Sequence, residues 1–477
     1  MDALGSAGNP LRTAIVGSGP SGFYAAEALL RSGRAVHVDM LERLPAPFGL
    51  VRHGVAPDHP KLKEPILVYD RIARSESFAF FGNVTVGRDV SVAELQATHH
   101  VVVFACGAET DRRLGIPGEA LPGSHTATEF VGWYNGHPDY RDRQFDFSHE
   151  VAVIIGQGNV AADVCRVLAK SVDELRHTDI AQHALEALAR SRVREIHVIG
   201  RRGPAQAKFT PQELKELGEL ADCDPVVDPD ELVLNAPSEA ERADKMNRAG
   251  ARNIEILRGF STRPQRGGKR CYFRFLLSPV EISGGARVEH VLLERNRLEG
   301  EAFKQVAVGM GEKIELECGL LFRSIGYRGV PIPGVSYDNR RGVIPNRDGR
   351  VLIGGEPAPG LYVTGWIKRG PSGIIGTNRA DSVATVAALL KDLPRLAAEP
   401  KPGNTGLRAL LSGRSVRGVE YGDWLAIDKA EIERGRPKGK PREKFTACEE
   451  MLAVITQEAA ASSAGCTQPG GRGRILA

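Results

Sequence analysis

The 477 residues suffice for two or three domains at the usual ~100–200 residues per domain. Apolar residues make up 42% and charged residues 26% of the chain, as in ordinary soluble globular proteins. The net charge is only +4, from 63 basic and 59 acidic residues, which argues against a surface that binds nucleic acid or membrane as a whole.

No apolar run reaches the ~20 residues that a membrane-spanning helix requires. The first residues show neither the basic and apolar regions of a secretory signal nor the arginine-rich pattern of an organelle leader. We therefore expect a cytoplasmic protein, although a mature mitochondrial form fits the same sequence. No pattern indicates an oligomer, and we expect a monomer.

The first predicted unit is a strand, a glycine-rich turn, a helix and a second strand. It runs from an apolar strand at 13–16 through Gly17-Ser18-Gly19-Pro20-Ser21-Gly22 to a helix at 25–30 and a strand at 35–41. In a dinucleotide-binding fingerprint the glycines make the turn, admit a pyrophosphate and let helix pack on strand. Pro20 suits a first helical turn, and Glu42, about 20 residues on, would bind ribose hydroxyls. The alternative is a tight strand–helix turn without a ligand.

Residues 45–60 are rich in proline and glycine, which predicts an irregular loop of the kind that is often functional. The apolar run at 100–105 predicts a buried strand of a parallel sheet.

A second fingerprint begins after the apolar strand at 151–155. It reads Gly156-Gln157-Gly158-Asn159-Val160-Ala161-Ala162, with alanine in place of the third glycine, and its helix extends to about 170. A charged helical insertion at 172–191 precedes the next strand, at 195–199, which ends in Arg201 and Arg202 rather than in an acidic residue. Two guanidinium groups can clamp a 2′-phosphate, which favours NADP(H) over NAD(H). A solvated basic turn is the alternative.

The pattern weakens from 220 to 300, with candidate strands at 271–277 and 288–295. A strand at 361–365 then enters Gly370-Pro371-Ser372-Gly373 and a helix that extends to Leu390. The free N–H groups at this helix N-terminus would stabilise the negative charge of a reduced flavin, and Trp366 would pack on its ring. A loop with a well-placed aromatic residue is the alternative. Residues 436–444 are basic and proline-rich, and the tail from about 459 has the composition of a disordered segment.

The sequence lacks the motifs of several kinds of redox and metal site. The seven cysteines form no Cys-x-x-Cys motif, which argues against a redox dithiol, a zinc ribbon or an iron–sulfur cluster. No histidine has metal-ligand spacing, so we expect no metal site. If this chain handles electrons, a bound organic cofactor or a separate protein must carry them.

The chain resembles the adrenodoxin reductase-type ferredoxin–NADP reductases. The matching segments run in order along nearly the whole sequence: VGSGPSGFY at 16–24, PFGLVRHGVAPDHP at 47–60, VGWYNG at 131–136, GQGNV at 156–160, VIGRRGP at 198–204, SIGY at 324–327, WIKRGPSG at 366–373 and GKPREK at 439–444.

The resemblance implies an α/β fold with two Rossmann-like domains: an FAD domain at 1–109 and 332–477 and an inserted NADPH domain at 110–331. It implies FAD contacts from the first fingerprint and from Ser21, Glu42, Leu50, Val86, Trp366, Gly373, Ile374 and Ile375. It implies NADPH contacts from Gln157, Gly158, Asn159, Val160, Arg201 and Arg202. Glu213 would hold the nicotinamide carboxamide, His59 and Asp163 would lie near the nicotinamide–flavin junction, and Gly373 where the cofactors meet. We name His59, Glu213 and Asp163 as candidate catalytic or orienting residues.

The activity implied is hydride transfer from NADPH to FAD, followed by single-electron transfer to an acidic ferredoxin-type iron–sulfur protein that supplies cytochrome P450 or other acceptors. A surface for such a partner is offered by the basic residues Arg190, Arg192, Arg194, Arg201, Arg202 and Lys208. A solvated helix face together with the 2′-phosphate clamp explains much of this stretch equally well. Two alternatives remain: an NADPH-dependent flavin monooxygenase and a non-catalytic nucleotide-binding subunit.

Overall fold

A computed structural model describes residues 2–465, and the chain forms two compact units. Unit 1 comprises the described residues of Met1–Arg52, Lys61–Gly107 and Gly329–Ala477. Unit 2 comprises His53–Pro60 and Ala108–Arg328. The chain passes from unit 1 to unit 2 at 107–108 and returns at 328–329, and the inserted domain at 110–331 stays a prediction. The segment 53–60 differs, because it packs with unit 2 rather than with the N-terminal residues around it.

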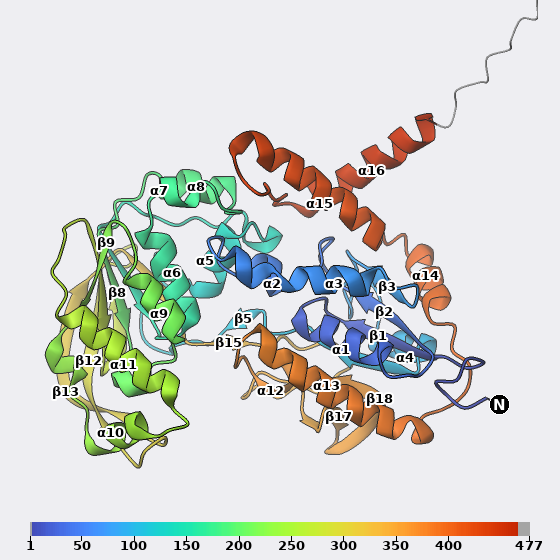
Figure 1. The fold of residues 1–477 in the computed structure, drawn as a ribbon, viewed down its shortest axis with the longest axis horizontal. Coiled ribbons are helices and arrows are strands. Elements are labelled where there is room, and N and C mark those ends of the chain that lie inside the picture. The colour runs from blue at the N-terminus through green and yellow to red at the C-terminus, as the bar shows by residue number, and fades with distance from the viewer. Residues whose placement is uncertain (1, 466–477) are drawn as a thin grey trace, which may run out of the picture. The chain divides into compact units, whose positions relative to one another are not determined.

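Unit 1 is built on a seven-stranded sheet in the order β16-β17-β18-β4-β1-β2-β3, in which β18, β4, β1, β2 and β3 are mutually parallel (Figure 1). Its strands are β1 (Leu11–Val16), β2 (Val36–Leu41), β3 (Phe78–Phe81), β4 (Val101–Phe104), β16 (Asn346–Arg347), β17 (Arg350–Ile353) and β18 (Glu356–Val363). Its helices are α1 (Pro20–Leu30), α3 (Pro65–Ala73), α4 (Val92–Thr98), α12 (Trp366–Arg369), α13 (Ile375–Asp392), α14 (Asn404–Gly413), α15 (Tyr421–Gly435) and α16 (Cys448–Gly465). The short α2 (Leu50–His53) ends at the first residue of unit 2.

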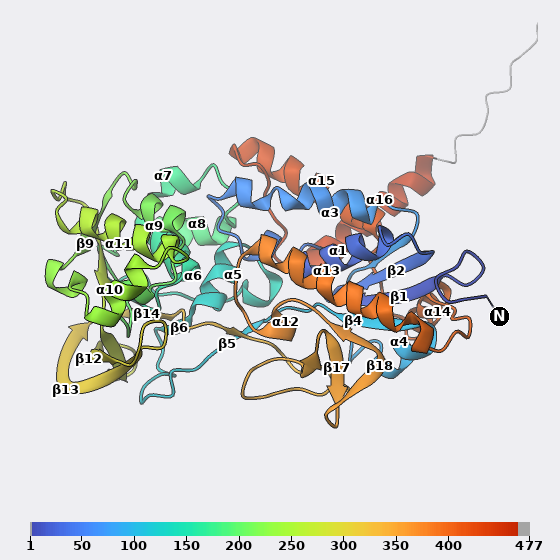
Figure 2. The ribbon, with the colours of Figure 1, turned by 60° about the horizontal axis from the view of Figure 1, so that its bottom comes forward.

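Apolar side chains cover both faces of this sheet, which explains why its central strands read as continuous apolar runs. All four residues of β4 are buried, and they alternate between two hydrophobic clusters on opposite faces. Helices α1 and α13, 355 residues apart at their first residues, lie side by side on one of these faces (Figures 1 and 2). The fold thereby brings the first fingerprint next to the segment around Trp366.

Unit 2 holds a six-stranded parallel sheet in the order β6-β14-β7-β8-β10-β9, a three-stranded antiparallel sheet β11-β12-β13 and the short pair β5–β15. Its strands are β5 (Thr110–Asp111), β6 (Ser124–Thr126), β7 (Val151–Ile155), β8 (Glu195–Ile199), β9 (Cys223–Val227), β10 (Lys269–Arg274), β11 (Leu277–Ser283), β12 (His290–Glu299), β13 (Val306–Glu317), β14 (Leu320–Arg323) and β15 (Tyr327–Arg328). Its helices are α5 (Ala127–Tyr134), α6 (Asn159–Ala169), α7 (Val172–Leu175), α8 (Gln182–Leu188), α9 (Pro211–Leu217), α10 (Ala236–Ala243) and α11 (Arg248–Ser261).

Several predicted elements differ from the structure. The loop predicted at 45–60 contains helix α2, because its apolar residue Val51 turns into the core and is fully buried. The single insertion helix at 172–191 is two short helices, α7 and α8. The weak region at 220–300 contains strands and helices that alternation did not reveal, among them the 14-residue helix α11.

The C-terminal prediction is partly wrong. Helix α16 extends through Gly465, so the first part of the tail predicted from about 459 is helical. The rest of that prediction, residues 466–477, lies outside the described residues.

Two cysteines that are far apart in sequence meet in the core of unit 2. The sulfur atoms of Cys165 and Cys271 lie 3.1 Å apart, and both residues are fully buried. Spacing along the chain could not show this pair. The contact with Cys165 and burial raise the pKa of the Cys271 thiol well above its ordinary value, so this thiol stays protonated.

Candidate functional site

The first fingerprint forms the turn between β1 and α1, at the carboxyl edge of the parallel sheet of unit 1. Gly17 has φ +105°, and a Cβ there would lie 2.7 Å from the Ala105 carbonyl oxygen. A Cβ on Gly22 would lie 2.1 Å from the Gly17 carbonyl oxygen, so only glycine lets α1 approach this closely. Gly19 has no atom within 4 Å of its Cβ position. This open space beside a helix N-terminus fits a pyrophosphate group.

Glu42 follows β2 and is tied to the same turn. One carboxylate oxygen accepts hydrogen bonds from the Ser18 amide (3.1 Å) and hydroxyl (2.7 Å), and the other accepts one from the Leu44 amide (3.1 Å). A carboxylate has about four acceptor positions, so one remains for a ribose hydroxyl. Glu42 thus stabilises the turn, and its contact with a ribose stays a prediction.

The segment around Trp366 meets the first fingerprint in space. A Cβ on Gly365 would lie 2.1 Å from the Ser21 hydroxyl, and the Ser382 hydroxyl of α13 donates to the Ser21 carbonyl oxygen at 2.9 Å. Trp366 donates its indole N–H to the Ser372 carbonyl oxygen at 3.2 Å, which folds the 370–373 turn back on α12. Residues 372–374 and 376 are exposed at the start of α13, although the amides of Ser372 and Ile374 donate to the Gly370 carbonyl oxygen and the Thr377 hydroxyl.

Leu50 and Val86 complete the predicted FAD set in unit 1. Leu50 is 37% exposed and follows Gly49, whose Cβ position lies 3.0 Å from the Gly19 Cα. Val86 is partly buried two residues after Val84, whose amide donates to the Glu42 carbonyl oxygen at 2.9 Å. The structure therefore gathers both residues near the first fingerprint and Glu42.

The second fingerprint repeats this geometry in unit 2, between β7 and α6. Gly156 has φ +131°, and a Cβ there would lie 2.1 Å from the Ser324 carbonyl oxygen, just as Gly17 packs against Ala105. Gly158, like Gly19, has no atom within 4 Å of its Cβ position. Ala161 occupies the third position and is fully buried.

Side chains of the second fingerprint brace the elements around it. Gln157 donates to the Arg274 carbonyl oxygen at 2.8 Å and packs against Gly200 at the end of β8. Asn159 accepts a hydrogen bond from the amide of Thr210, the residue before α9, at 2.8 Å. Because α9 carries Glu213, this bond ties the fingerprint to the predicted nicotinamide residue. Val160 packs against the core of unit 2.

Arg201 and Arg202 follow β8 at the same carboxyl edge. Arg201 is exposed and Arg202 half-buried. Neither guanidinium forms an ion pair or donates a hydrogen bond to any residue in the range 2–465. Burial and the adjacent Arg201 charge lower the pKa of Arg202, which Glu241 partly offsets. Two adjacent cations without an anionic partner in the described chain are a ready site for a phosphate.

His59, Asp163 and Glu213 converge on a residue that the sequence analysis missed, Arg166. Its guanidinium donates to Asp58 (2.7 and 3.2 Å), to Asp163 (2.5 Å) and to Glu213 (3.0 Å), and lies 3.3 Å from the His59 Nδ1. The Arg166 side chain is only 2% exposed. An arginine within the otherwise apolar run Val164–Leu168 of α6 is the sequence signal that identifies it.

Lys170 and Glu216 contact this cluster at its periphery. Lys170 donates to Asp58 at 2.8 Å, and His59 Nε2 lies 2.7 Å from a Glu216 carboxylate oxygen. His59, Glu213 and Glu216 each bring a potential metal ligand within 4.8 Å of the others. Arg166 and these internal hydrogen bonds already engage the same atoms, so the arrangement favours a charge network rather than a metal centre.

The carboxylates of the cluster titrate differently. Burial alone would raise the pKa of Asp58, but hydrogen bonds from Arg166 and the Arg166 and Lys170 charges hold it well below its ordinary value. Burial, with the Asp163 charge, raises the pKa of Glu213 to about 7. Burial also raises the pKa of Asp163. Glu213 therefore titrates near neutral pH, and it is one of the groups predicted to face nicotinamide.

We expect Glu213→Gln to change how stability depends on pH. The pKa of Glu213, about 7, lies above its ordinary value of 4.5, so the folded state binds this proton more tightly than the unfolded state. The resulting stabilisation is fully present below pH 4.5 and is lost as the pH rises through 7. Glutamine stays neutral, so the variant should gain stability relative to the wild type from pH 5 to pH 8 in urea unfolding.

The control for this prediction is Glu219→Gln, which removes a carboxylate that is 56% exposed just after the same helix. The control curve should run parallel to that of the wild type. Parallel curves for Glu213→Gln as well would show that Glu213 is already ionised at pH 5.

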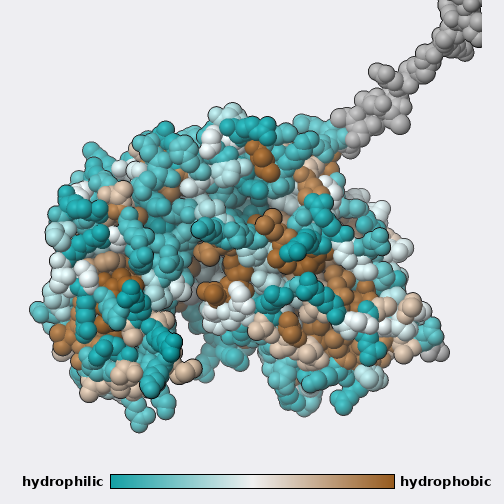
Figure 3. Space-filling view, in the orientation of Figure 1, coloured by the Kyte–Doolittle hydropathy of each residue, from teal (hydrophilic) through white to brown (hydrophobic). Residues whose placement is uncertain are grey.

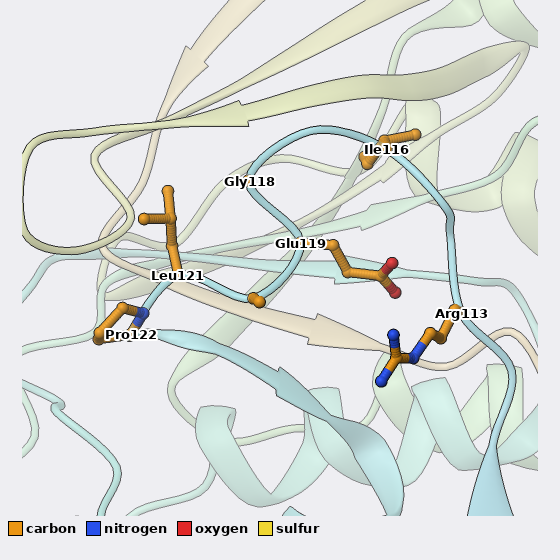
Figure 4. Close-up of a pocket in the computed structure, with 7 residues that line it drawn as sticks. Arg113, Ile116, Gly118, Glu119, Leu121 and Pro122 are labelled. Carbon is orange, nitrogen blue, oxygen red and sulfur yellow. The ribbon is translucent and has the colours of Figure 1, made fainter.

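A surface pocket in unit 2 is separate from these residues. It is lined by Arg113, Ile116, Gly118, Glu119, Ala120, Leu121 and Pro122 (Figure 4). The Glu119 carboxylate accepts hydrogen bonds from the Leu114 and Gly115 amides at 2.7 and 2.9 Å and pairs with Arg323. The pocket contains none of the predicted site residues, and its carboxylate already holds the turn together.

No helix within residues 2–465 is both long and apolar enough to cross a bilayer. Figure 3 shows hydrophilic residues over much of the face in view, with hydrophobic residues in separate patches.

Comparisons with known proteins agree with this geometry. Residues 15–74 match the model of an NAD(P)-binding Rossmann-like domain. The chain is 45% identical over 458 residues to NADPH-ferredoxin reductase FprA of Mycobacterium tuberculosis, covering 93% of this chain and 99% of that protein. It is 44% identical over 456 residues to mitochondrial NADPH:adrenodoxin oxidoreductase of Mus musculus, covering 92% and 91%. The solved structure of FprA in complex with NADPH superposes with a TM-score of 0.88, at 44% identity and 94% and 100% coverage.

Proposed function

Because the chain belongs to the family of NADPH-dependent ferredoxin and adrenodoxin reductases, we propose that it is a flavoprotein that passes electrons from NADPH through FAD to a ferredoxin-type iron–sulfur protein. FAD, when bound, accepts a hydride and releases its two electrons singly. The residues of the chain bind and orient the cofactors and exclude water around them.

The observation that carries this proposal is the pairing of two similar fingerprints with opposite charges. Unit 1 places Glu42 beside its turn, which suits the ribose hydroxyls of FAD. Unit 2 places Arg201 and Arg202 at the equivalent edge, and no described residue neutralises them by an ion pair. A chain that binds one kind of nucleotide twice would not need these opposite charges.

The residues fit both cofactors. We assign FAD to unit 1, held by Gly17, Gly19, Pro20, Ser21, Gly22, Glu42, Leu50, Val86, Trp366, Gly373, Ile374 and Ile375. We assign NADPH to unit 2, held by Gln157, Gly158, Asn159, Val160, Arg201, Arg202 and Glu213. The open Cβ positions at Gly19 and Gly158 support both assignments, because each leaves room for a pyrophosphate beside a helix N-terminus.

Within unit 2, Glu213 titrates near neutral pH and His59 is oriented by Glu216. A protonated Glu213 can donate to the carbonyl oxygen of a carboxamide, and an ionised one can accept from its amide group. Hydride transfer itself needs no general acid or base, so these residues orient the nicotinamide rather than exchange protons with it.

The electrons must leave for another protein. The pair Cys165–Cys271 is the candidate internal acceptor that the fold creates, but both thiols are buried and the pKa of Cys271 is raised. An acceptor dithiol needs an accessible thiolate. We propose that the partner is acidic, in line with the exposed arginines Arg192 and Arg194 of unit 2. We also propose that the enzyme is monomeric and lies in the cytoplasm.

We expect the purified protein to be yellow and its visible absorbance to bleach on anaerobic addition of NADPH. Added ferredoxin should then accelerate reduction of cytochrome c, and stopped-flow absorbance measures both steps. A colourless protein that cannot be reconstituted with FAD would indicate a nucleotide-binding subunit instead. Bleaching without any acceleration by ferredoxin would contradict the partner assignment.

A further inference from the structure

The C-terminal segment 431–445, here called the clamp segment, has no role in the proposed function. Its basic and proline-rich composition predicts solvated charges, yet four of its charged residues are buried. Their exposed fractions are 0% for Glu431, 6% for Lys440, 3% for Glu443 and 2% for Lys444. Charged side chains are rarely buried unless they are paired. The segment must therefore hold specific partners.

Arg52 is the main partner outside the clamp segment. Its guanidinium lies 2.5 Å from a Glu431 carboxylate oxygen, and the two side chains are 3% and 0% exposed. The Lys444 ammonium donates to the Arg52 backbone carbonyl oxygen at 3.3 Å. The Arg52 guanidinium also lies 4.9 Å from the centre of the Trp424 ring of α15. The clamp segment, together with Trp424 in the preceding part of α15, thus contacts both the side chain and the backbone of Arg52.

Residues of the clamp segment also form hydrogen bonds with one another. The Glu431 oxygen that meets Arg52 also accepts a hydrogen bond from the Phe445 amide at 2.9 Å, and the Glu443 amide donates to the Glu431 carbonyl oxygen at the same distance. Lys440 donates to Glu443 at 2.7 Å within the buried layer. These hydrogen bonds link Lys440, Glu443 and Phe445 to Glu431, either directly or through one another.

Arg52 lies in α2, at the end of the segment 45–52, which is here called the loop 45–52. The middle of this loop contacts the first fingerprint. Phe48 has φ +85°, an unfavourable conformation for a bulky residue. Its amide donates to the Ser18 carbonyl oxygen at 3.1 Å, and the Gly49 Cβ position lies 3.0 Å from the Gly19 Cα. The Phe48 ring packs edge-on against Trp424, with the ring centres 5.7 Å apart. A strained residue persists only where its surroundings hold it.

We propose that the clamp segment positions the loop 45–52 over Gly19 and thereby controls how tightly FAD is retained. Glu431 and Arg52 are positioning residues that act through Phe48 and Gly49 on the pyrophosphate site. Removing the Glu431 charge leaves the Arg52 guanidinium buried without its counter-ion, which strongly destabilises the local arrangement. The loop then relaxes away from Gly19. This inference rests on the proposed function, because it takes FAD as the ligand of unit 1.

The test compares FAD release from the full-length holoenzyme and from Glu431→Gln. Glutamine keeps an acceptor for the Phe445 amide, so the variant removes mainly the charge. Flavin fluorescence after dilution measures the release rate, and we expect it to rise at least tenfold. Binding of NADP⁺ to unit 2, measured by calorimetry, should be unchanged.

The matched control is Asp224→Asn in unit 2. Asp224 is a carboxylate whose side chain is 2% exposed, and it lies 2.8 Å from Arg266, whose side chain is 47% exposed, so its loss also breaks the ion pair of a buried carboxylate. We expect a comparable fall in the unfolding temperature but an unchanged rate of FAD release. Equal release rates for Glu431→Gln and the wild type, with the unfolding temperature lowered as in the control, would overturn the proposal.

If Glu431→Gln does not fold, the variant Lys444→Met tests the proposal instead. It removes the ammonium group that donates to the Arg52 carbonyl oxygen, and we expect a two- to fivefold faster release of FAD. An unchanged rate in folded Lys444→Met would overturn the proposal. A wild-type protein that binds no FAD would instead contradict the proposed function, and this inference with it.

Discussion

The double variant Arg201→Ala/Arg202→Ala should bind NADPH about 10²–10⁴-fold more weakly than the wild type while its affinity for NADH hardly changes. Two charge-assisted hydrogen bonds contribute ~1.5–3 kcal/mol each, and 1.4 kcal/mol corresponds to a tenfold change in affinity. Only NADPH carries the 2′-phosphate. Because neither guanidinium has an ion-pair partner in the described residues, its removal leaves no buried carboxylate behind. The measurement is the dissociation constant of each nucleotide at fixed ionic strength.

Arg192→Ala/Arg194→Ala is the control for this experiment. It removes the same charge from two exposed residues that precede β8, whereas Arg201 and Arg202 follow the strand. A general electrostatic effect on an anionic ligand would appear in both double variants and fade with salt. Equal losses for NADPH and NADH in Arg201→Ala/Arg202→Ala would show that the pair has another function.

The second large effect is expected for Arg166→Met. This substitution leaves Asp58, Asp163 and Glu213 without the cation that they share, and removing one partner of a buried ion pair typically destabilises by ~3–5 kcal/mol. The unfolding free energy in urea should fall by that order. The rate of flavin reduction by NADPH should fall as well, because the orientation of Glu213 and His59 depends on the same guanidinium. Arg166→Lys should recover part of both losses.

Arg176→Met provides the comparison for Arg166→Met. Arg176 pairs with Asp173 at 2.8 Å three residues earlier, as Arg166 does with Asp163, but both side chains are more than half exposed. Surface pairs of this kind contribute ~0–1 kcal/mol. A loss for Arg166→Met as small as that for Arg176→Met would mean that the carboxylates of the cluster are protonated and need no counter-charge.

The fingerprints were predictable from sequence because their chemistry is local. The turn at Gly17–Gly22 needs glycines at fixed spacing, and a strand and helix next to it in the chain make the rest of the site. The same holds for Gly156–Ala161 and for the arginines that follow β8. In each case the residues lie within about 50 positions of one another, so spacing and periodicity are sufficient.

The cluster around Arg166 was only half predictable. The resemblance to a known family identified His59, Asp163 and Glu213, but not the arginine that joins them. Its partners come from 58, 163 and 213, which periodicity within one helix does not connect. The raised pKa of Glu213 likewise depends on burial and on the neighbouring Asp163, neither of which sequence spacing reveals.

The sequence by itself determined that this chain has two nucleotide-binding turns and that one of them carries positive charge, because turn geometry and phosphate recognition depend on neighbouring residues. Only the tertiary structure decided which charges are buried. It placed the segment 53–60 in unit 2, brought the Cys165 sulfur to 3.1 Å from the Cys271 sulfur, and buried Lys440 beside Glu443 and Lys444 against the Arg52 carbonyl oxygen. The physical reason is that the energy of a charge depends on its distance from water and from opposite charges, which the chain sets only when it folds.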